Sequence, residues 1–268
     1  AHKRDADVKR AGCGALGMLL RGLSAGAVEP EVLGEAVEAI VGAMRALPDE
    51  VTLHAEACAA LRDIAEDEGI AGEIASRGGL EAVVESLRLH ADSHEVQHGA
   101  LGAICSLCRR KDTAASLVES GGLGPMLQGM SGHAPVQEVH QAGCGALRTL
   151  AAHGAFDAAL QDAGAVPSVL ESMRSHPTSD AVQSDGCHIL SRLSATPEGA
   201  SLVAREGGVE VLATAMRSQA SSGDAMRDGT TALRNVAAAD PESGAQSVLQ
   251  AGAIEATVAS MREHADSP

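Results

Sequence analysis

Apolar residues return along this chain at a fixed interval. A leucine-type residue ends each copy of a shared pattern of about nine residues, at Leu16, Leu61, Ile104, Leu147, Leu190 and Leu233. The last four steps of that series are each 43 residues. A second series with the same period consists of Met44, Leu87, Met130, Met173, Met216 and Met261. Two series with one period predict tandem copies of a single structural unit, stacked side by side.

The copy at residues 157–195 predicts three helices. A short helix over 157–163 is followed by Gly164-Ala165-Val166-Pro167, which breaks it. A second helix is expected over 166–176 and a longer third helix over 181–194, each with an apolar stripe at helical spacing. The glycine of the break recurs at Gly78, Gly121, Gly164, Gly207 and Gly252. Glycine can take the left-handed conformation that ends a helix, so each of these residues predicts a turn.

Two further positions repeat just before the leucine-type residue. A small residue four places earlier recurs as Gly12, Ala57, Ala100, Gly143, Gly186 and Gly229. It predicts that a neighbouring helix crosses closely there, since glycine inside a helix otherwise costs about 1 kcal/mol. Cysteine recurs three places before the leucine as Cys13, Cys58, Cys144 and Cys187. At a repeated, core-facing position cysteine is expected to act as a small buried hydrophobe rather than to form disulfides.

These motifs resemble armadillo repeats. The best matches are Gly164-Ala165-Val166-Pro167 and the third-helix segment Val182-Gln183-Ser184-Asp185-Gly186-Cys187-His188-Ile189-Leu190. The resemblance implies an all-α fold, a right-handed α–α superhelix that forms one armadillo-like solenoid domain over residues 1–268. We expect about five full repeats (23–66, 67–109, 110–152, 153–195 and 196–239) between a partial repeat at 1–22, which is a third helix, and another at 240–268.

Composition limits the kinds of binding partner and of cellular compartment that we expect. The chain has no Trp or Tyr, only Phe156, and a net charge of −16, so neither aromatic hot spots nor a nucleic-acid backbone is expected at its binding surface. The acidic residues concentrate at 23–69, which suggests a basic partner, although a solvated surface explains them as well. With no secretory signal and no apolar run long enough to cross a membrane, we expect a reducing compartment, the cytoplasm or the nucleus, and no membrane insertion.

The sequence predicts no enzyme, cofactor or metal site. Histidine forms a ladder at His90, His133, His176 and His264, but neighbouring members lie about one helix-packing distance apart, roughly 10 Å, and cannot share a zinc ion. We expect these histidines, and the arginines two residues before several of them, to bind free carbonyls at the end of the second helix. Cys105 and Cys108 form a lone C-x-x-C that suits core packing.

In armadillo proteins the third helices line a groove that binds an extended peptide. Importin-alpha-like members carry Trp two residues before the leucine and Asn two residues after it. The Trp positions here are Gly14, Ala59, Gly102, Gly145, His188 and Thr231. The Asn positions are Met18, Asp63, Ser106, Thr149, Arg192 and Asn235. Only Asn235 matches, which counts against a nuclear transport adaptor.

The candidate partner-binding residues are mostly basic. Arg62, Arg148 and Arg234 each follow the leucine by one residue, in alternate repeats, and could contact an acidic or extended peptide. Arg192 and Asn235 occupy the groove's Asn position, and Arg109-Arg110-Lys111 is a short basic segment. Solvated helix-end charges are the competing interpretation of these residues.

The sequence therefore predicts a non-enzymatic scaffold that binds a protein or an extended peptide on its third helices. An architectural subunit of a larger assembly is the alternative. Neither end of the array carries the polar cap that a solenoid needs, so either the chain is a piece of a longer array or its ends pair with something, by end-to-end self-association or membership of a larger complex. A nuclear transport adaptor is the least favoured hypothesis.

Overall fold

The computed structural model describes residues 2–21, 29–219, 222–241 and 243–263, and within them the regular secondary structure is entirely helical. The chain forms two compact units, Ala1–Leu150 and Ala151–Pro268. The helices of the first are α1 (His2–Leu20), α2 (Pro30–Ala46), α3 (Val51–Ile64), α4 (Glu68–Ser76), α5 (Gly79–Leu89), α6 (His94–Leu107), α7 (Lys111–Glu119), α8 (Leu123–Gly132) and α9 (Gln137–Ala152), which runs two residues past the boundary. Those of the second are α10 (Asp157–Asp162), α11 (Ala165–Ser175), α12 (Asp180–Leu193), α13 (Pro197–Arg205), α14 (Gly208–Ser218), α15 (Gly223–Ala239), α16 (Ser243–Gln250) and α17 (Ala253–Glu263).

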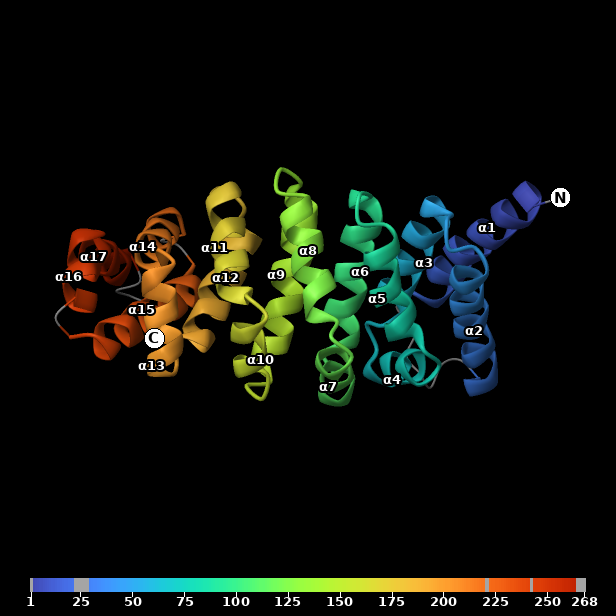
Figure 1. Cartoon of the computed structure of the whole chain (residues 1–268), viewed down its shortest axis with the longest axis horizontal. Helices are drawn as coiled ribbons and strands as arrows, with labels where there is room; N and C mark the ends of the chain where they lie inside the picture. The colour runs from blue at the N-terminus through green and yellow to red at the C-terminus, as the bar shows by residue number, and fades with distance from the viewer. Residues whose placement is uncertain (1, 22–28, 220–221, 242, 264–268) are drawn as a thin grey trace. The chain divides into compact units, whose positions relative to one another are not determined.

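Like helices lie side by side within each unit (Figure 1). In the first unit the third helices α1, α3 and α6 pack in series, and so do the second helices α2, α5 and α8. In the second unit α12 packs on α15, while α11, α14 and α17 form the row of second helices. The chain is therefore an all-α solenoid, as the 43-residue period predicts.

The predicted helices of residues 157–195 are confirmed as α10, α11 and α12, with ends shifted by one residue. The division of the chain into numbered repeats stays a prediction. The start of the first predicted repeat falls on residues 22–28, outside the described residues.

The turn glycines have the conformation that the sequence predicts. Gly78, Gly121, Gly164, Gly207 and Gly252 all have φ between 70° and 88°. A side chain is strained in that left-handed region, so glycine is needed where the first helix of each repeat turns into the second. Gly154, which belongs to no repeated position, also has a positive φ, of 68°.

The predicted close crossings are confirmed in three repeats. A Cβ placed on Gly143 would lie 2.6 Å from Met130 Sδ, and one on Gly229 would lie 2.9 Å from Met216 Cγ. At Gly186 the side chain of Met173 occupies the same space. In these three repeats the methionine of the second helix therefore packs directly onto the glycine of the third helix that follows it. The methionine series of the second helices and the small-residue series of the third helices therefore contact each other in these repeats.

The expectation about the histidine ladder holds in part: His133 Nε2 lies 2.8 Å from Ala91 O, just past the end of α5, but the other carbonyls are bound differently. His90 and His176 end α5 and α11 as predicted, but glutamines bind the free carbonyls there. Gln97 Nε2 donates to Leu87 O and His90 O, both at 3.0 Å. Gln183 Nε2 donates to Met173 O at 2.9 Å and His176 O at 3.0 Å. Both glutamines lie seven residues before the leucine of their own third helix, and His264 lies outside the described residues.

Two arginines of the second helices also bind carbonyls, but of the following repeat. Arg174 donates to Glu206 O at 2.7 Å, and Arg217 donates to Ala251 O at 3.0 Å. Each of those carbonyls lies at the turn where the next short helix ends, where cations are favoured by the helix dipole. These arginines therefore join neighbouring repeats rather than closing their own helix.

Candidate functional site

A groove of about 510 Å³ crosses three successive third helices of the first unit. We call it the unit 1 groove. It is lined by Ala55, Ala59 and Arg62 of α3, His94, Glu95, His98 and Gly99 of α6, and Val136 and Glu138 at the start of α9. It lies on the face of the third helices where armadillo-like repeats are expected to bind peptides.

Small residues line part of the groove, and a glycine beside it leaves room for the side chain of Arg62. A Cβ on Gly102 of α6 would lie 2.7 Å from Arg62 Cδ, so the absence of a side chain at Gly102 leaves space for the stem of Arg62. Gly102 is a position where importin-alpha-like repeats carry Trp. Here the arginine stem of the preceding third helix occupies that space.

Hydrogen bonds fix the orientation of Arg62 and His98. His98 Nδ1 lies 3.0 Å from Glu138 O, and His98 Nε2 lies 3.3 Å from Arg62 NH1. Because a carbonyl can only accept and a guanidinium can only donate, the neutral tautomer with hydrogen on Nδ1 satisfies both contacts. Arg62 also donates to Asp63 Oδ1 at 3.0 Å, and Asp63 in turn pairs with Arg21 of the α1 end.

The rim of the groove offers both donors and acceptors. His94 and Glu95 are exposed at the start of α6, with His94 Nδ1 3.4 Å from a Glu95 carboxylate oxygen. Hydrogen bonds from the backbone of Glu95 itself and from the Ser93 hydroxyl lower the pKa of the Glu95 carboxyl, so it stays an anionic acceptor at neutral pH. Together with Arg62, these groups present complementary charges within one small surface.

The other candidates of the first unit lie outside the groove. Arg109 donates to Ala65 O at 2.9 Å and also to Glu66 O, so it closes the carboxyl end of α3. Arg110 pairs with Asp112 at 2.5 Å, while Lys111 is exposed at the first position of α7. The predicted basic segment therefore does not act as one surface. Arg109 and Arg110 are bonded within the fold, and Lys111 is exposed. Arg148 is exposed on α9.

The candidates of the second unit fall in separate places. Arg192 donates to Asp157 Oδ2 at 3.0 Å, and burial raises the pKa of the Asp157 carboxyl although Arg192 opposes that shift. Arg234 is exposed on α15. Asn235 donates to Ser194 Oγ at 3.3 Å and lies 3.5 Å from Ser191 O, so its amide is used to bind the preceding third helix. It lines a hollow of about 150 Å³ next to Thr196 and Pro197.

Sequence reasoning missed most of the groove. His98 lies six residues before Ile104, and the equivalent positions of the other repeats are Arg10, Ala55, Gln141, Ser184 and Arg227. All are polar or small, which is the signal of a helix face that avoids the core. Aligning that position across repeats would have found His98. Glu95 and Glu138 share one repeat position, nine residues before the leucine-type residue, which is also acidic at Asp7 and Asp224, so the same alignment would have found them, whereas His94 has no comparable repeated signal.

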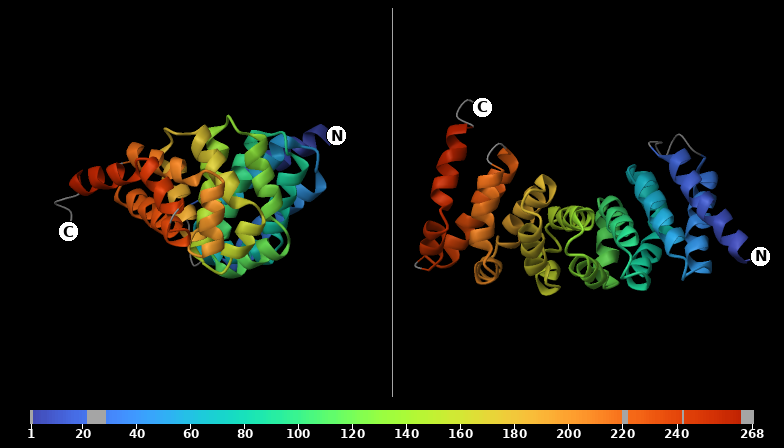
Figure 2. Two further views of the ribbon diagram at one scale, coloured as in Figure 1. Left: turned by 60° about the vertical axis from the view of Figure 1, so that its left-hand side comes forward. Right: turned by 90° about the horizontal axis from the view of Figure 1, so that it is seen from above.

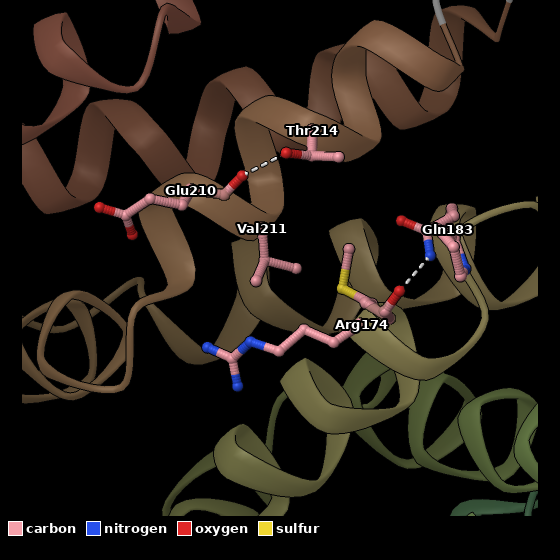
Figure 3. Close-up of a pocket in the computed structure, with 7 residues that line it drawn as sticks. Arg174, Gln183, Glu210, Val211 and Thr214 are labelled. Carbon is pink, nitrogen blue, oxygen red and sulfur yellow. Dashed lines mark hydrogen bonds between the residues drawn. The ribbon is translucent and has the colours of Figure 1, made fainter. Parts of the chain in front are cut away.

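A third hollow, of about 280 Å³, lies between the second helices α11 and α14 (Figure 3). It is lined by Met173, Arg174, Pro177, Gln183, Glu210, Val211 and Thr214. Gln183 and Arg174 are already bonded to main-chain carbonyls, and Thr214 donates to Glu210 O at 2.8 Å. The unit 1 groove is larger, and its His94 and Glu95 side chains are exposed, so it is the better candidate for binding.

The described residues contain no group of three His, Cys, Asp or Glu side chains placed to hold a metal ion. Cys108 of the C-x-x-C is buried, and burial raises the pKa of its thiol to about 12, while Cys105 Sγ contacts Thr149 Oγ1 at 3.5 Å. In the same part of the chain, none of the helices combines the length and apolarity needed to cross a bilayer.

A solved structure and a protein-family model both resemble the chain. The crystal structure of an engineered protein superposes with a TM-score of 0.68 and 20% identity, covering 89% of this chain and 92% of that one, a likeness that concerns the fold. No curated protein matches the sequence. The family model described as LRRK2 ARM repeat matches residues 65–261, which is most of the chain. The chain therefore belongs to the LRRK2 ARM repeat family, a family of armadillo-type repeats.

Proposed function

We propose that this chain is a non-enzymatic protein–protein interaction scaffold that binds a protein or an extended peptide in the unit 1 groove. The observation that carries the proposal is a groove across three third helices with a floor of small residues and a rim of both charges. An extended chain presents alternating N–H and C=O groups, so a surface with donors and acceptors suits main-chain recognition. Arg62 and His94 are the donors and Glu95 is the acceptor.

The compartment belongs to the same proposal. All six cysteines are free thiols, and four of them occupy the repeated buried position. Such thiols persist where the medium is reducing, which supports the cytoplasm or the nucleus. The net charge of −16 supports a protein partner over a nucleic acid. A nuclear transport adaptor has less support, because Asn235 uses its amide within the fold.

A peptide-display library screened against the full chain tests the proposal. We expect it to select extended peptides that lose at least about tenfold in affinity with Arg62→Ala, since tenfold corresponds to about 1.4 kcal/mol. Ala59→Gln should act similarly by filling the groove. Arg88→Ala on α5 and Ala39→Gln on α2 are matched controls, because both residues are exposed on second helices. A screen that yields no extended peptide, or peptides indifferent to both groove variants, would reject the groove.

A further inference from the structure

One side chain of the unit 1 groove contacts the third helices on both sides of its own. His98 of α6 is half-buried, with Nδ1 3.0 Å from Glu138 O of α9 and Nε2 3.3 Å from Arg62 NH1 of α3. Figure 2 shows α3 and α6 side by side in the first unit, where the colour passes from blue to green. Arg62 is one of the donors to which we assign peptide binding, so the ring of His98 acts directly on a residue of the proposed site.

Arg62 is oriented by Gly102, Asp63 and His98. Its stem passes Gly102, where a Cβ would lie 2.7 Å from Arg62 Cδ. Its Nε and NH2 donate to Asp63 Oδ1 at 3.1 and 3.0 Å, on the next residue of the same helix. His98 supplies an acceptor for NH1. The guanidinium is therefore held on two sides, and it keeps further N–H groups for a ligand.

The contact between His98 and Arg62 needs a neutral ring. The Glu138 carbonyl can only accept, so it takes the hydrogen on Nδ1, and the guanidinium can only donate, so Nε2 must carry no hydrogen. Protonation of His98 would place a second donor against Arg62 NH1 and add a positive charge beside the guanidinium. Histidine ordinarily changes its charge between pH 5 and 8. The contact with Arg62 is therefore lost when the ring takes up a proton.

Charged and titratable groups surround the ring on three helices and one turn. They are Arg62 and Asp63 of α3, Glu138 of α9, His94 and Glu95 of α6, and His133 in the turn before α9, which acts on Glu95. Glu95 stays an anion, because hydrogen bonds from its own backbone and from the Ser93 hydroxyl lower the pKa of its carboxyl. His94 and His133 are the other rings in this set whose charge ordinarily changes between pH 5 and 8, so their effect on binding must be separated from that of His98.

We infer that His98 is a positioning residue of the unit 1 groove, which holds Arg62 in place for a peptide while its ring is neutral and releases Arg62 when the ring is protonated. The inference rests on the proposed function, because it concerns the regulation of the same site. A guanidinium that is already held loses less side-chain freedom on binding than a released one does. Peptide affinity should therefore fall by about threefold as the ring is protonated. The fall is smaller than that expected from Arg62→Ala, because a released Arg62 can still donate.

Isothermal titration calorimetry of the full chain at pH 7.5 and 5.5 tests the inference. The probe is a peptide selected from the display library, capped at both ends and free of Asp, Glu and His, so that the peptide itself does not titrate. Wild type should bind it more weakly at pH 5.5. His98→Gln should bind it equally at both pH values, because a glutamine amide oxygen can accept from Arg62 at the place of Nε2 and does not titrate. His98→Asn should bind about threefold more weakly than His98→Gln at both pH values, because the shorter amide keeps a donor for Glu138 O but does not reach Arg62. Circular dichroism at both pH values checks that all three proteins keep the same helix content.

Nitrogen-15 NMR of the unliganded chain reports on the ring itself. At pH 7.5 the His98 ring should carry its hydrogen on Nδ1, and a hydrogen on Nε2 instead would overturn the inference, because such a ring cannot accept from Arg62. A pH dependence of binding that persists in His98→Gln would also overturn it, since that dependence would belong to His94 or His133. A chain that binds no peptide at either pH would reject the groove together with the inference. Equal binding by wild type at both pH values would reject the inference alone.

Discussion

At the scale of single residues, a buried histidine pair sets a pH dependence. His54 lies seven residues before Leu61, the position held by Gln97 and Gln183 in other repeats, and it also binds a second-helix carbonyl, with Nε2 3.2 Å from Leu47 O. Its Nδ1 lies 2.7 Å from Ser86 Oγ, and its ring centroid lies 4.4 Å from that of His90. Burial and the neighbouring His90 lower the pKa of His54 below 6.5. The folded protein therefore holds His54 neutral.

The sign of the resulting effect follows from proton binding. Between the lowered pKa of folded His54 and pH 6.5, the unfolded chain binds a proton at His54 more readily than the folded chain does, so unfolding takes up protons. The contribution of His54 to stability is present above pH 6.5 and is lost as the pH falls towards the lowered pKa. Each unit of pKa depression corresponds to about 1.4 kcal/mol.

His54→Gln should reduce this pH dependence without breaking the carbonyl contact, because glutamine serves that contact in two other repeats. Urea unfolding of wild type and variant at pH 7.5 and 5.5 measures it. Wild type should lose more stability between the two pH values than the variant does. Carboxylates contribute equally to both proteins, so they cancel in the difference. Equal losses in the two proteins would show that His54 titrates normally in the fold.

At the scale of helices, the methionine of a second helix and the glycine of the next third helix share one space. The residue that fits at either position therefore depends on the residue at the other. Gly186→Ala should raise helix propensity by about 1 kcal/mol. However, a Cβ there would lie 2.7 Å from Met173 Cγ, so the two helices must separate or Met173 must move. Overpacking of this kind typically costs about 1–3 kcal/mol, and we expect a net loss of stability.

The second repeat of the chain shows which pair of residues fits at these two positions without a glycine. There Leu87 and Ala100 occupy the two positions, and both are buried without a glycine. Met173→Leu combined with Gly186→Ala should therefore be more stable than the sum of the single changes. A double-mutant cycle by urea unfolding gives the coupling. Additive single effects would mean that the two positions do not share space.

The same contact shows how much of the fold the sequence could predict. Period, turn glycines, helix types and buried cysteines are carried by residue identity alone, and each can be aligned by eye. The hydrogen-bond or ion-pair partner of each polar side chain cannot be read from residue identity. Arg109 and Arg110 form a basic segment in the sequence, but in the fold they meet carbonyls and carboxylates of neighbouring helices. Such partners depend on ångström-scale distances between repeats that no single segment specifies.

In the candidate site, too, some features could be predicted from residue identity and others depend on helix packing. Arg62 was predictable from its repeated place after the leucine. The groove around it depends on Gly102 leaving room for the arginine stem, and on His98 reaching the first turn of α9. Both contacts join residues about 40 positions apart, so they follow from the packing of third helices and not from a local motif.

At the scale of the whole molecule, stability should be lowest where a helix has a neighbour on one side only. In a repeat array each unit buries its apolar face on adjacent units, so local opening is expected to begin at uncovered helices. In the first unit that helix is α1, whose Val8 and Leu19 are exposed, and the best covered is α6, whose apolar face is fully buried. In the second unit the corresponding helices are α17 and α12.

Hydrogen exchange of the dilute full chain measures this difference within each unit. Amides of α1 should exchange at least about tenfold faster than those of α6, and amides of α17 faster than those of α12 by a similar factor, because opening free energies rise with the number of packed neighbours. Uniform exchange along the chain at low concentration would show that the array opens as a single cooperative block, so that its end helices have no separate stability.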